Sequence, residues 1–395
     1  MLCCACFIAL TCAASATHSS QEIFIRHTSP DPLTQQAIDA CALEVGPRWP
    51  SGHAAGAPVV MTYATKISDP FMLGVSAALH NMPLAVVGFN MPGWNWWDGV
   101  VLQKVSAPRR AVQLVQALLG DVPVALVDSG DVLVTNGLTM AQRHALEQFR
   151  RHVLLGAECN SWPVCYRDAY ARDTEHQHCL GKHGACFPNG GVSLARSSTM
   201  LDFLSAFRTV GKSTLQMSNL AERGNDQSAL HYLYLNRSRF PTLQVHVDSS
   251  SRFSLQLWTC KGNQGGYVYR QRGGPFELCH HRKHEPLNEV RVSGDGRTLE
   301  FNETRNGTRI GKPQHPVFVH SNGYHFKLKD PIFAPLLSLY EDPTRLAELL
   351  ERPVLLVEWQ HERRTVPCTV ASLGWLINAT RHPKGAPRFL GRTMG

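Results

Sequence analysis

Short apolar runs alternate with amphipathic stretches through much of the chain. Runs rich in β-branched and other apolar residues predict strands over residues 58–65, 84–89, 122–128, 153–158, 189–195 and 242–248. Apolar residues at helical spacing predict helices over residues 71–81, 110–120, 140–151, 197–211 and 225–236. Buried strands that alternate with amphipathic helices indicate an α/β fold with a parallel sheet of the doubly wound kind.

Local signals mark the ends of several of these helices. Asp69-Pro70 is typical of a helix start, because a capping residue is followed by proline at the first helical position. Thr139 can cap the helix that follows it, and Gly120 is typical of a helix end. These boundaries agree with the hydrophobic periodicity.

The second half of the chain is less regular. Residues 315–323 predict a strand that runs into a turn, whereas residues 261–314 are rich in Gly, Arg, His and Asn and predict a long irregular insertion. From about residue 333 a leucine-rich pattern predicts a small helical C-terminal tail. The predicted division is a leader segment at 17–57, a main domain at 58–332 that contains the insertion, and a C-terminal extension at 333–395.

The N-terminus has the pattern of a secretory signal peptide. An apolar stretch of about ten residues ends in the small residues Ala14-Ser15-Ala16, which predicts a signal peptide over residues 1–16. An ordinary apolar N-terminus is the alternative, because no basic residue precedes the stretch. Asn-x-Ser/Thr sites favour a secretory glycoprotein, in the lumen of the endoplasmic reticulum or Golgi or secreted; they are Asn236, Asn302, Asn306 and Asn378.

Cysteine usage is consistent with that route. Cleavage would leave eight of the twelve cysteines, namely Cys41, Cys159, Cys165, Cys179, Cys186, Cys260, Cys279 and Cys368. An even number in a secretory chain favours disulfides. The four between residues 159 and 186 could form two local bridges. Zinc is the alternative for this group, since His176, His178 and His183 lie nearby, although the spacings match no standard zinc finger.

Composition and charge narrow the class of protein. The chain has 395 residues, of which 43% are hydrophobic and 18% charged, as expected for a folded protein. The net charge of +8 is spread along the chain, which argues against a nucleic-acid surface and fits an anionic ligand such as a nucleotide. No run of about 18 apolar residues follows the leader, so we expect no stable membrane span after signal cleavage.

Two aspartates three positions apart follow one of the predicted strands. Asp128 and Asp131 end the apolar run at 122–128, and ligands of doubly wound sheets bind beyond the carboxyl ends of the strands. Carboxylates are suitable ligands for Mg²⁺ or Mn²⁺. The pair therefore predicts a metal site, with an acidic turn as the alternative, because aspartate is common in turns.

The segments around this pair are similar to those of a known enzyme family. In order they are VVMTYATK, Gln103-Lys104, VDSGDVLVTNG, LGAE, NGGVSLA, NDQSALHYLYL and VFVHSNG. Their order and approximate spacing resemble the glycosyltransferase domain of the procollagen-lysine 2-oxoglutarate 5-dioxygenases, the multifunctional lysyl hydroxylases. The resemblance covers roughly Val59 to Lys327, and its most specific parts are the Asp-x-x-Asp segment and residues 320–323.

This resemblance implies a fold, a donor and a metal. The fold would be of the GT-A type, a Rossmann-like mixed sheet flanked by helices, and the donor would be a UDP-sugar. Asp128, Asp131 and the distant His320 would hold Mn²⁺, for which a mixed set of oxygen and nitrogen ligands is suitable. The strand that ends at His320 should then end beside the strand that ends at Asp128, with the imidazole directed at both carboxylates. A structural hydrogen bond is the alternative role for His320.

The resemblance also implies residues that contact the UDP-sugar. The donor-binding set, which includes Asp128, would contain Thr62 and Thr65 near the uridine, Lys104 at the diphosphate, and Asn322 and Gly323 in a loop that closes over it, with Lys327 after them. The loop has one residue more than the family pattern before Lys327. A solvated surface position is the alternative for Lys104.

Two acidic residues match the acceptor side of the family's site. Glu158 and Asp226 are the predicted catalytic carboxylates. A salt bridge to an arginine is the alternative for Glu158, and capping of the helix that begins at Gln227 is the alternative for Asp226. The family usually has a short run of aspartates before this glutamine, of which only Asp226 is present here.

We therefore expect a Mn²⁺-dependent hexosyltransferase that moves glucose or galactose from UDP to a hydroxyl, on hydroxylysine, galactosyl-hydroxylysine or another protein or glycan acceptor. A non-catalytic protein that binds UDP-sugar or glycan is the alternative. It is favoured because only Asp226 is present where the family has a run of aspartates. A glycosyltransferase acting on nucleic acid is disfavoured by the signal peptide. After His320 no His-x-Asp with a later His could hold Fe²⁺, so dioxygenase activity is not expected.

Overall fold

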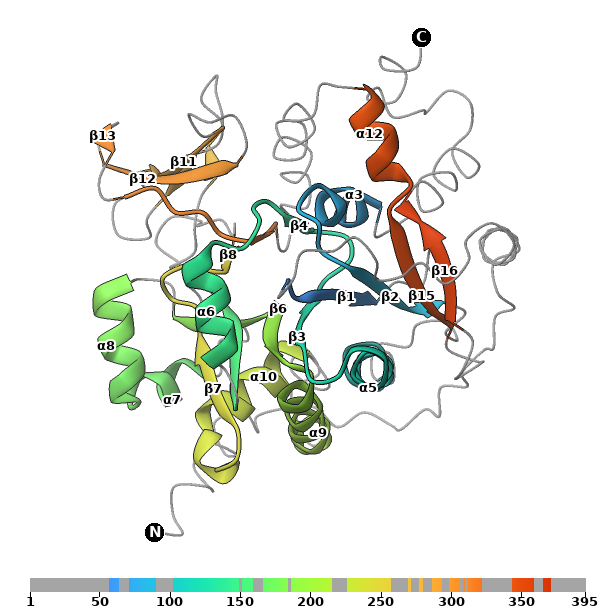
Figure 1. Cartoon of the computed structure of the whole chain (residues 1–395). Coiled ribbons are helices and arrows are strands. Elements are labelled where there is room, and N and C mark those ends of the chain that lie inside the picture. The colour runs from blue at the N-terminus through green and yellow to red at the C-terminus, as the bar shows by residue number, and fades with distance from the viewer. Residues whose placement is uncertain are drawn as a thin grey trace, which may run out of the picture.

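The structure is a computed structural model (Figure 1). It describes residues 57–63, 71–89, 102–148, 151–158, 166–183, 186–214, 226–256, 269–270, 277–279, 286–292, 298–305, 308–309, 312–321, 343–358 and 365–370. The predicted signal peptide and Asp69-Pro70 lie outside these residues.

An eight-stranded mixed sheet forms the centre of the molecule, with strand order β16-β15-β2-β1-β3-β6-β5-β7. Its middle strands β1 (Val59–Tyr63), β2 (Leu84–Phe89) and β3 (Pro123–Val127) run parallel to one another. These strands are apolar on both faces, as expected for strands covered by helices on each side. The predicted strands at these positions are confirmed.

One central strand runs against its neighbours. β6 (Phe187–Arg196) pairs antiparallel with both β3 and β5 (His152–Glu158), while β7 (Gln244–Val247) is parallel to β5. The apolar pattern, which indicated a parallel sheet, did not reveal this reversed strand, whereas the mixed sheet that the family resemblance implied is confirmed. A strand buried on both faces has the same apolar pattern in either direction, so the pattern alone does not fix it.

Helices cover both faces of this sheet and enclose two hydrophobic cores. Alternate residues of β1 point to opposite sides, so that Val60 packs with α3 (Phe71–Leu79), whereas Val59 and Met61 pack with α5 (Ala107–Leu119). The second core also contains apolar residues of α9 (Ser197–Thr214) and α10 (Asp226–Leu235). Figure 1 shows α5 and α9 on one side of the sheet and α3 on the other.

The predicted helix boundaries hold where they are described. Thr139 caps α6 (Met140–Gln148): its hydroxyl accepts the backbone N–H of Gln142, and its own N–H donates to the Gln142 side chain. α5 ends at Gly120, whose φ of 75° favours glycine, and its N–H donates to the Gln116 carbonyl. A π-helical turn (Leu102–Ser106) leads into α5, and α7 (Arg167–Ala171) and α8 (Thr174–His183) precede β6.

A separate three-stranded sheet lies at the carboxyl end of β3. β14 (Phe318–His320) pairs antiparallel with β4 (Val132–Val134) and parallel with β8 (Ser254–Gln256). The strand before His320 thus belongs to this small sheet and not to the main one. It still reaches the end of β3, because β4 follows β3 after a single turn.

Two sequence predictions about the later segments need correction. The region 261–314, predicted to be irregular, contains a five-stranded antiparallel sheet made of β9 (Tyr269–Arg270), β10 (Glu277–Cys279), β11 (Pro286–Val292), β12 (Leu299–Arg305) and β13 (Thr308–Arg309). β9, β10 and β13 have only two or three residues, too few to show a pattern. In β12, however, the buried Leu299 and Phe301 alternate with polar residues, and this signal of a strand was overlooked. Figure 1 shows this sheet apart from the central one.

The C-terminal extension is only partly helical. α12 (Pro343–Leu350) is followed by β15 (Pro353–Glu358) and β16 (Thr365–Thr369). β15 pairs parallel with β2 and β16 pairs antiparallel with β15, so both extend the central sheet. The prediction of a small helical tail overlooked an apolar run of five residues, Pro353 to Val357, that lies between β2 and β16 in the main sheet. The domain boundaries proposed from sequence remain predictions.

The structure also bears on disulfides and membrane spans. Cys179 in α8 forms a disulfide with Cys186, immediately before β6. Cys159 and Cys165 lie outside the described residues, so the second predicted local bridge stays a prediction. Among the described helices, none has the length and apolar character needed to cross a membrane.

Candidate metal centre and adjoining pocket

The acidic turn lies where the sequence predicted it, at the carboxyl end of a central strand. Asp128 follows β3 directly, and Asp131 precedes β4. The backbone N–H of Asp128 donates to the carbonyl of Gly191 in β6, with an N–O distance of 3.0 Å. Both carboxylates remain partly accessible, since each side chain is 23% exposed.

His320 reaches this turn through the register of the small sheet. It is the last residue of β14 and lies opposite Val132, the residue after Asp131. The backbone N–H of Ser321 then donates to the Asp131 carbonyl at 2.8 Å. Strand pairing, rather than closeness in sequence, thus brings the histidine to the aspartates.

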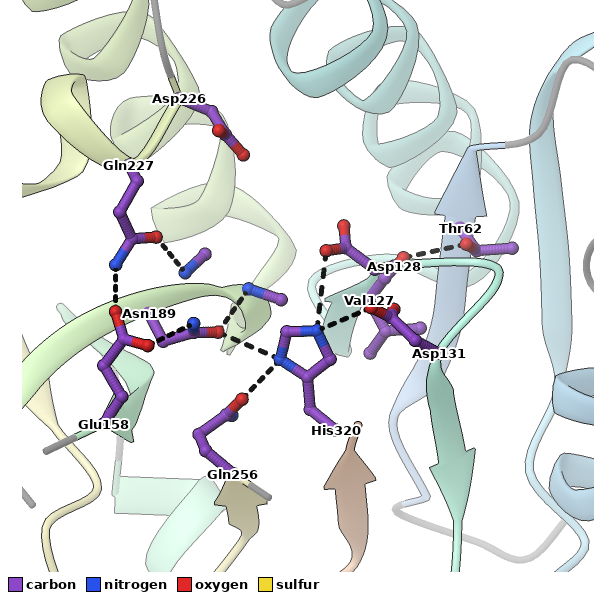
Figure 2. A network of polar contacts seen from close by, with 12 residues as sticks. Thr62, Val127, Asp128, Asp131, Glu158, Asn189, Asp226, Gln227, Gln256 and His320 are labelled. Carbon is purple, nitrogen blue, oxygen red and sulfur yellow. Dashed lines mark hydrogen bonds and ion pairs between the residues drawn. The ribbon is translucent and has the colours of Figure 1, made fainter. Parts of the chain in front are cut away.

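The three side chains converge as predicted (Figure 2). His320 Nε2 lies 3.2 Å from Asp131 Oδ2 and 3.8 Å from Asp128 Oδ2. One ligand atom from each of the three residues lies within 4.8 Å of the other two. His320 Nε2 is buried and has no hydrogen-bond partner among the described residues. A lone pair directed at two carboxylates suits a cation, so these residues could hold a divalent metal ion.

The opposite side of the imidazole is held by polar contacts. His320 Nδ1 lies 3.0 Å from Asn189 Oδ1 and also contacts Gln256 Oε1. The ring packs against Gly191, where a Cβ atom would lie only 2.0 Å from His320 Cε1. Glycine is required at this position because any side chain would displace the ring.

The charges of the centre shift one another's pKa values. Burial alone would lower the pKa of His320, but the attraction of Asp131 and then Asp128 raises it above the ordinary value. Burial raises the pKa of Asp128 and repulsion by Asp131 adds to this, while Lys104 and His320 oppose it. The cluster therefore has a strong preference for added positive charge.

Lys104 is a partly buried partner of this cluster and not a solvated surface lysine. Its side chain is 18% exposed, its Nζ forms an ion pair with Asp128 Oδ1, and it lies 3.3 Å from Asp226 Oδ2. Burial by itself would lower the pKa of Lys104, but Asp128, Tyr63 and Asp226 raise it well above the usual value. Lys104 thus supplies a fixed positive charge next to Asp128, suitable for an anionic ligand.

A pocket opens beside Lys104 and Asp128. These two residues and Asp226 line it together with apolar residues that include Met61 and Phe203. A few charged groups in a largely apolar lining are typical of small-molecule sites. The helix capping that was the alternative for Asp226 has no hydrogen bond to support it among the described contacts, and its carboxylate is 30% exposed.

Thr62 and Tyr63 line the same pocket from β1. The Thr62 hydroxyl donates to the Val127 carbonyl at 2.8 Å, which ties β1 to β3. Tyr63 Oη lies 3.5 Å from Asp128 Oδ1, and burial raises the pKa of its phenol. Thr62 therefore lines the pocket with its hydroxyl occupied by a backbone contact, and its place near the uridine stays a prediction.

Glu158 is a buried carboxyl group, and its predicted acceptor-side role stays a prediction. Its side chain is 5% exposed at the end of β5. It accepts hydrogen bonds from Asn189 Nδ2 at 3.2 Å and from Gln227 Nε2 at 2.7 Å. These two amide groups thus hold its carboxyl group in place.

Several predicted residues cannot be placed, and several contributors were not predicted. Thr65, Asn322, Gly323 and Lys327 lie outside the described residues, so their roles stay predictions. Sequence reasoning missed Asn189, Gln256 and Tyr63 as members of the site. The two glycines after Asn189 were a usable signal, because glycine inside an apolar strand often marks the close approach of another group.

A second group of buried histidines lies between α7, α8, α10 and β6. His176 is 0% exposed and packs against the rings of Tyr170 and Phe187. Tyr170 Oη is hydrogen-bonded to His231 Nδ1. The zinc alternative for this region has no support in the described part of the chain, where Asp128, Asp131 and His320 are the one set of side chains with metal-binding geometry. Burial lowers the pKa of His176 to about 4.

Comparison with known proteins gives a limited result. No protein-family model matches the chain, and no curated protein does. Among solved structures, the chain is similar to the glycosyltransferase GlyE of Streptococcus pneumoniae TIGR4, with 17% sequence identity and a TM-score of 0.29. The match covers 51% of this chain and 47% of the GlyE chain, about half of each. A TM-score this low adds no weight to the functional argument below.

Proposed function

We propose that this protein is a metal-dependent glycosyltransferase that moves glucose or galactose from a UDP-sugar to a hydroxyl group. The observation that carries the proposal is the convergence of Asp128, Asp131 and His320 at the end of β3, beside a pocket that the partly buried Lys104 lines. Two carboxylates and one imidazole suit Mn²⁺. When bound, that ion would neutralise charge on the departing diphosphate.

The chain's own residues have distinct roles in this proposal. Lys104 contacts the diphosphate, for which it would exchange its ion pair with Asp128. The apolar part of the pocket lining, with Met61 and Phe203, supports the nucleoside and excludes water. The family resemblance adds Thr65, Asn322, Gly323 and Lys327 to the donor site.

Transfer requires one bond to break and one to form. The bond between the anomeric carbon and the diphosphate oxygen breaks, and the acceptor oxygen bonds to that carbon while its proton leaves. Asp226 is the carboxylate of the pocket lining that remains 30% exposed, so we assign it to the acceptor hydroxyl. Hydroxylysine or galactosyl-hydroxylysine is the proposed acceptor, on the resemblance alone.

One observation favours a second function, namely binding of a UDP-sugar or glycan without turnover. Glu158, the other predicted catalytic acid, is engaged by two amide groups and is almost fully buried. Together with the presence of a single aspartate before Gln227, this leaves Asp226 as the accessible acid. The two functions share the metal and donor site and differ only in transfer.

UDP release from UDP-glucose and UDP-galactose, with and without Mn²⁺ and hydroxylysine peptides, tests the proposal. We expect release that depends on both metal and acceptor, and its loss in Asp131→Ala. Asp226→Asn should keep UDP affinity and lose transfer. Mn²⁺-dependent UDP binding without release would favour the binding protein, and the absence of any Mn²⁺ effect on UDP binding would refute both.

We further propose that the protein works in the secretory pathway. The Cys179–Cys186 disulfide supports this, since such bonds persist in oxidising compartments. Mass spectrometry of thiol-alkylated protein from its native source should find these two cysteines protected and the N-terminus cleaved after residue 16. Free thiols at both positions in that material would contradict the proposal.

A further inference from the structure

A buried chain of polar contacts leads away from the metal centre behind His320 (Figure 2). Glu158 Oε2 accepts a hydrogen bond from Asn189 Nδ2 at 3.2 Å, and Asn189 Oδ1 lies 3.0 Å from His320 Nδ1. All three side chains are at most 5% exposed. Water therefore does not compete for these contacts, and the groups themselves determine which atom donates and which accepts.

The orientation of the Asn189 amide is fixed from two sides. The backbone N–H of Gly191 donates to Asn189 Oδ1 at 2.8 Å, and a backbone N–H can only donate. On its other side, Asn189 Nδ2 donates to Glu158 Oε2 at 3.2 Å, so the amide NH₂ group faces the carboxyl group. Both contacts require the same orientation, which directs the amide oxygen at His320.

This orientation determines which nitrogen of His320 carries hydrogen. An amide oxygen accepts and cannot donate, so Nδ1 of His320 must be the donor. In the neutral ring, Nε2 then carries the lone pair, and Nε2 is the atom that faces Asp128 and Asp131. That tautomer is the one that a metal ion bound by the two aspartates requires.

We propose that Asn189 and Glu158 are positioning residues that hold His320 in its metal-binding tautomer. Gln227, which donates to the other oxygen of Glu158 at 2.7 Å, supports the carboxylate. Glu158 thus acts through Asn189 on the metal ligand, in place of the acceptor-side role predicted for it from sequence. The inference rests on the proposed function, because it requires a metal ion at Asp128, Asp131 and His320.

The tautomer can be observed directly, without metal or activity. Long-range ¹H–¹⁵N NMR of protein labelled at histidine distinguishes Nδ1–H from Nε2–H rings at alkaline pH, and the signal lost in His320→Gln identifies this residue. We expect Nδ1–H in the wild-type protein. An Nε2–H ring would overturn the proposal.

Variants that exchange the amide of Asn189 and the carboxylate of Glu158 test the contact between these two side chains. Glu158→Gln leaves two amide donors to compete for one oxygen, and Asn189→Asp places two carboxylates in contact. Each should weaken Mn²⁺ binding by about 10- to 100-fold, the usual effect of losing a partner that orients a metal ligand. The double variant Glu158→Gln with Asn189→Asp restores one donor and one acceptor, and should return the affinity to within about threefold of wild type.

A matched control variant tests whether the effect on Mn²⁺ affinity is specific to Asn189 or follows the loss of any amide that contacts a histidine. Gln148 also contacts a histidine through its amide, with 2.9 Å between Gln148 Nε2 and His144 Nε2, on the exposed surface of α6. Gln148→Leu should leave Mn²⁺ affinity and the His320 tautomer unchanged, whereas Asn189→Leu should alter both. Equal behaviour of these two variants would overturn the proposal.

Failure of the inference and failure of the proposed function give different results. If wild-type protein shows no Mn²⁺ electron paramagnetic resonance change that His320→Gln removes, the metal site itself is refuted. If that change is present but folded Glu158→Gln and Asn189→Asp variants keep wild-type affinity, only the positioning role is refuted. Folding is checked by circular dichroism, and the wild-type tautomer decides the question if a variant does not fold.

Discussion

Two histidines of this protein are equally buried but have opposite electrostatic surroundings. His320 is 3% exposed and faces Asp128 and Asp131, which raise its pKa above the ordinary value although burial opposes them. His176 is 0% exposed and lies against Tyr170 and Phe187, where burial lowers its pKa to about 4. The depth of burial alone therefore does not decide the charge of a histidine, because its neighbours do.

Each of these histidines also has a buried nitrogen without a hydrogen bond among the described residues. Around His176 the neighbours are aromatic rings, so the unpaired nitrogens belong to a packed interior. Around His320 the unpaired Nε2 faces two carboxylates within 3.8 Å. A buried nitrogen without a hydrogen bond is thus a consequence of packing at His176 and a candidate metal ligand at His320.

Substitution of the two histidines should produce the largest difference in Mn²⁺ affinity between the two regions. His320→Ala should lower Mn²⁺ affinity by more than about 100-fold, because loss of a ligand exceeds loss of a group that only orients one. His176→Phe should change Mn²⁺ affinity by less than about twofold. Titration calorimetry with Mn²⁺ measures both. Similar losses of Mn²⁺ affinity in the two variants would show that the two histidines do not differ in metal binding.

Acid should destabilise the protein through the aromatic region. The folded pKa of His176 is about 4 against an ordinary 6.5, so the unfolded chain binds more protons between these values. Its contribution to stability is complete above about pH 6.5 and falls as the pH is lowered, by about 2 kcal/mol between about pH 7 and about pH 5. Urea denaturation at both pH values measures this loss.

His176→Phe is the control for this acid effect. It should reduce the loss of stability between the two pH values, but not abolish it, because burial also lowers the pKa of His80 to about 4. If the variant and the wild-type protein lose the same free energy of unfolding, His176 is not responsible.

Two adjacent glycines allow the packing of His320 to be tested. A Cβ atom at Gly191 would lie 2.0 Å from the His320 ring, whereas one at Gly190 would meet its first neighbour, Asp226 Oδ2, at 3.7 Å. Gly191→Ala should therefore weaken Mn²⁺ binding by about tenfold, within the range for disturbed ligand orientation. Gly190→Ala should have little effect. A reversed order would show that the ring is not held against β6.

The smallest expected effect concerns the lysine beside the metal centre. Lys104→Met removes a cation that forms an ion pair with Asp128, so it should raise Mn²⁺ affinity about threefold to tenfold in the absence of nucleotide. The same change should weaken UDP binding, because the diphosphate loses a partner. Calorimetric titrations with Mn²⁺ and with UDP measure the two effects, and a fall in both affinities would contradict the competition proposed here.

Much of the fold could be predicted from local patterns. Apolar runs located β1, β2 and β3, helical spacing located α3 and α9, and Thr139 marked the start of α6. These signals are local, because they arise from side-chain periodicity and from hydrogen bonds within one turn of helix. The strands of the insertion and the strand β15 were missed. The partner of β15 in the parallel pair, β2, lies far away in sequence, whereas β11 and β12 pair with each other across a short connection.

The candidate site, like the fold, was predictable only in part from the sequence. The acidic pair could be placed from its position after β3, and His320 was added by the family resemblance. Asn189 and Gln256 were not found, because they act on His320 through contacts that span 131 and 64 residues of sequence.

The sequence by itself thus determined where strands, helices and acidic ligands lie along the chain. Only the tertiary structure decided that β6 runs antiparallel between β3 and β5, which brings Asn189 and Gly191 to the back of His320. Only the register of β14 on β4 decided that His320 meets Asp131. The physical reason is that local conformation depends on neighbouring residues, whereas strand direction and register depend on partners that the chain reaches only when it folds.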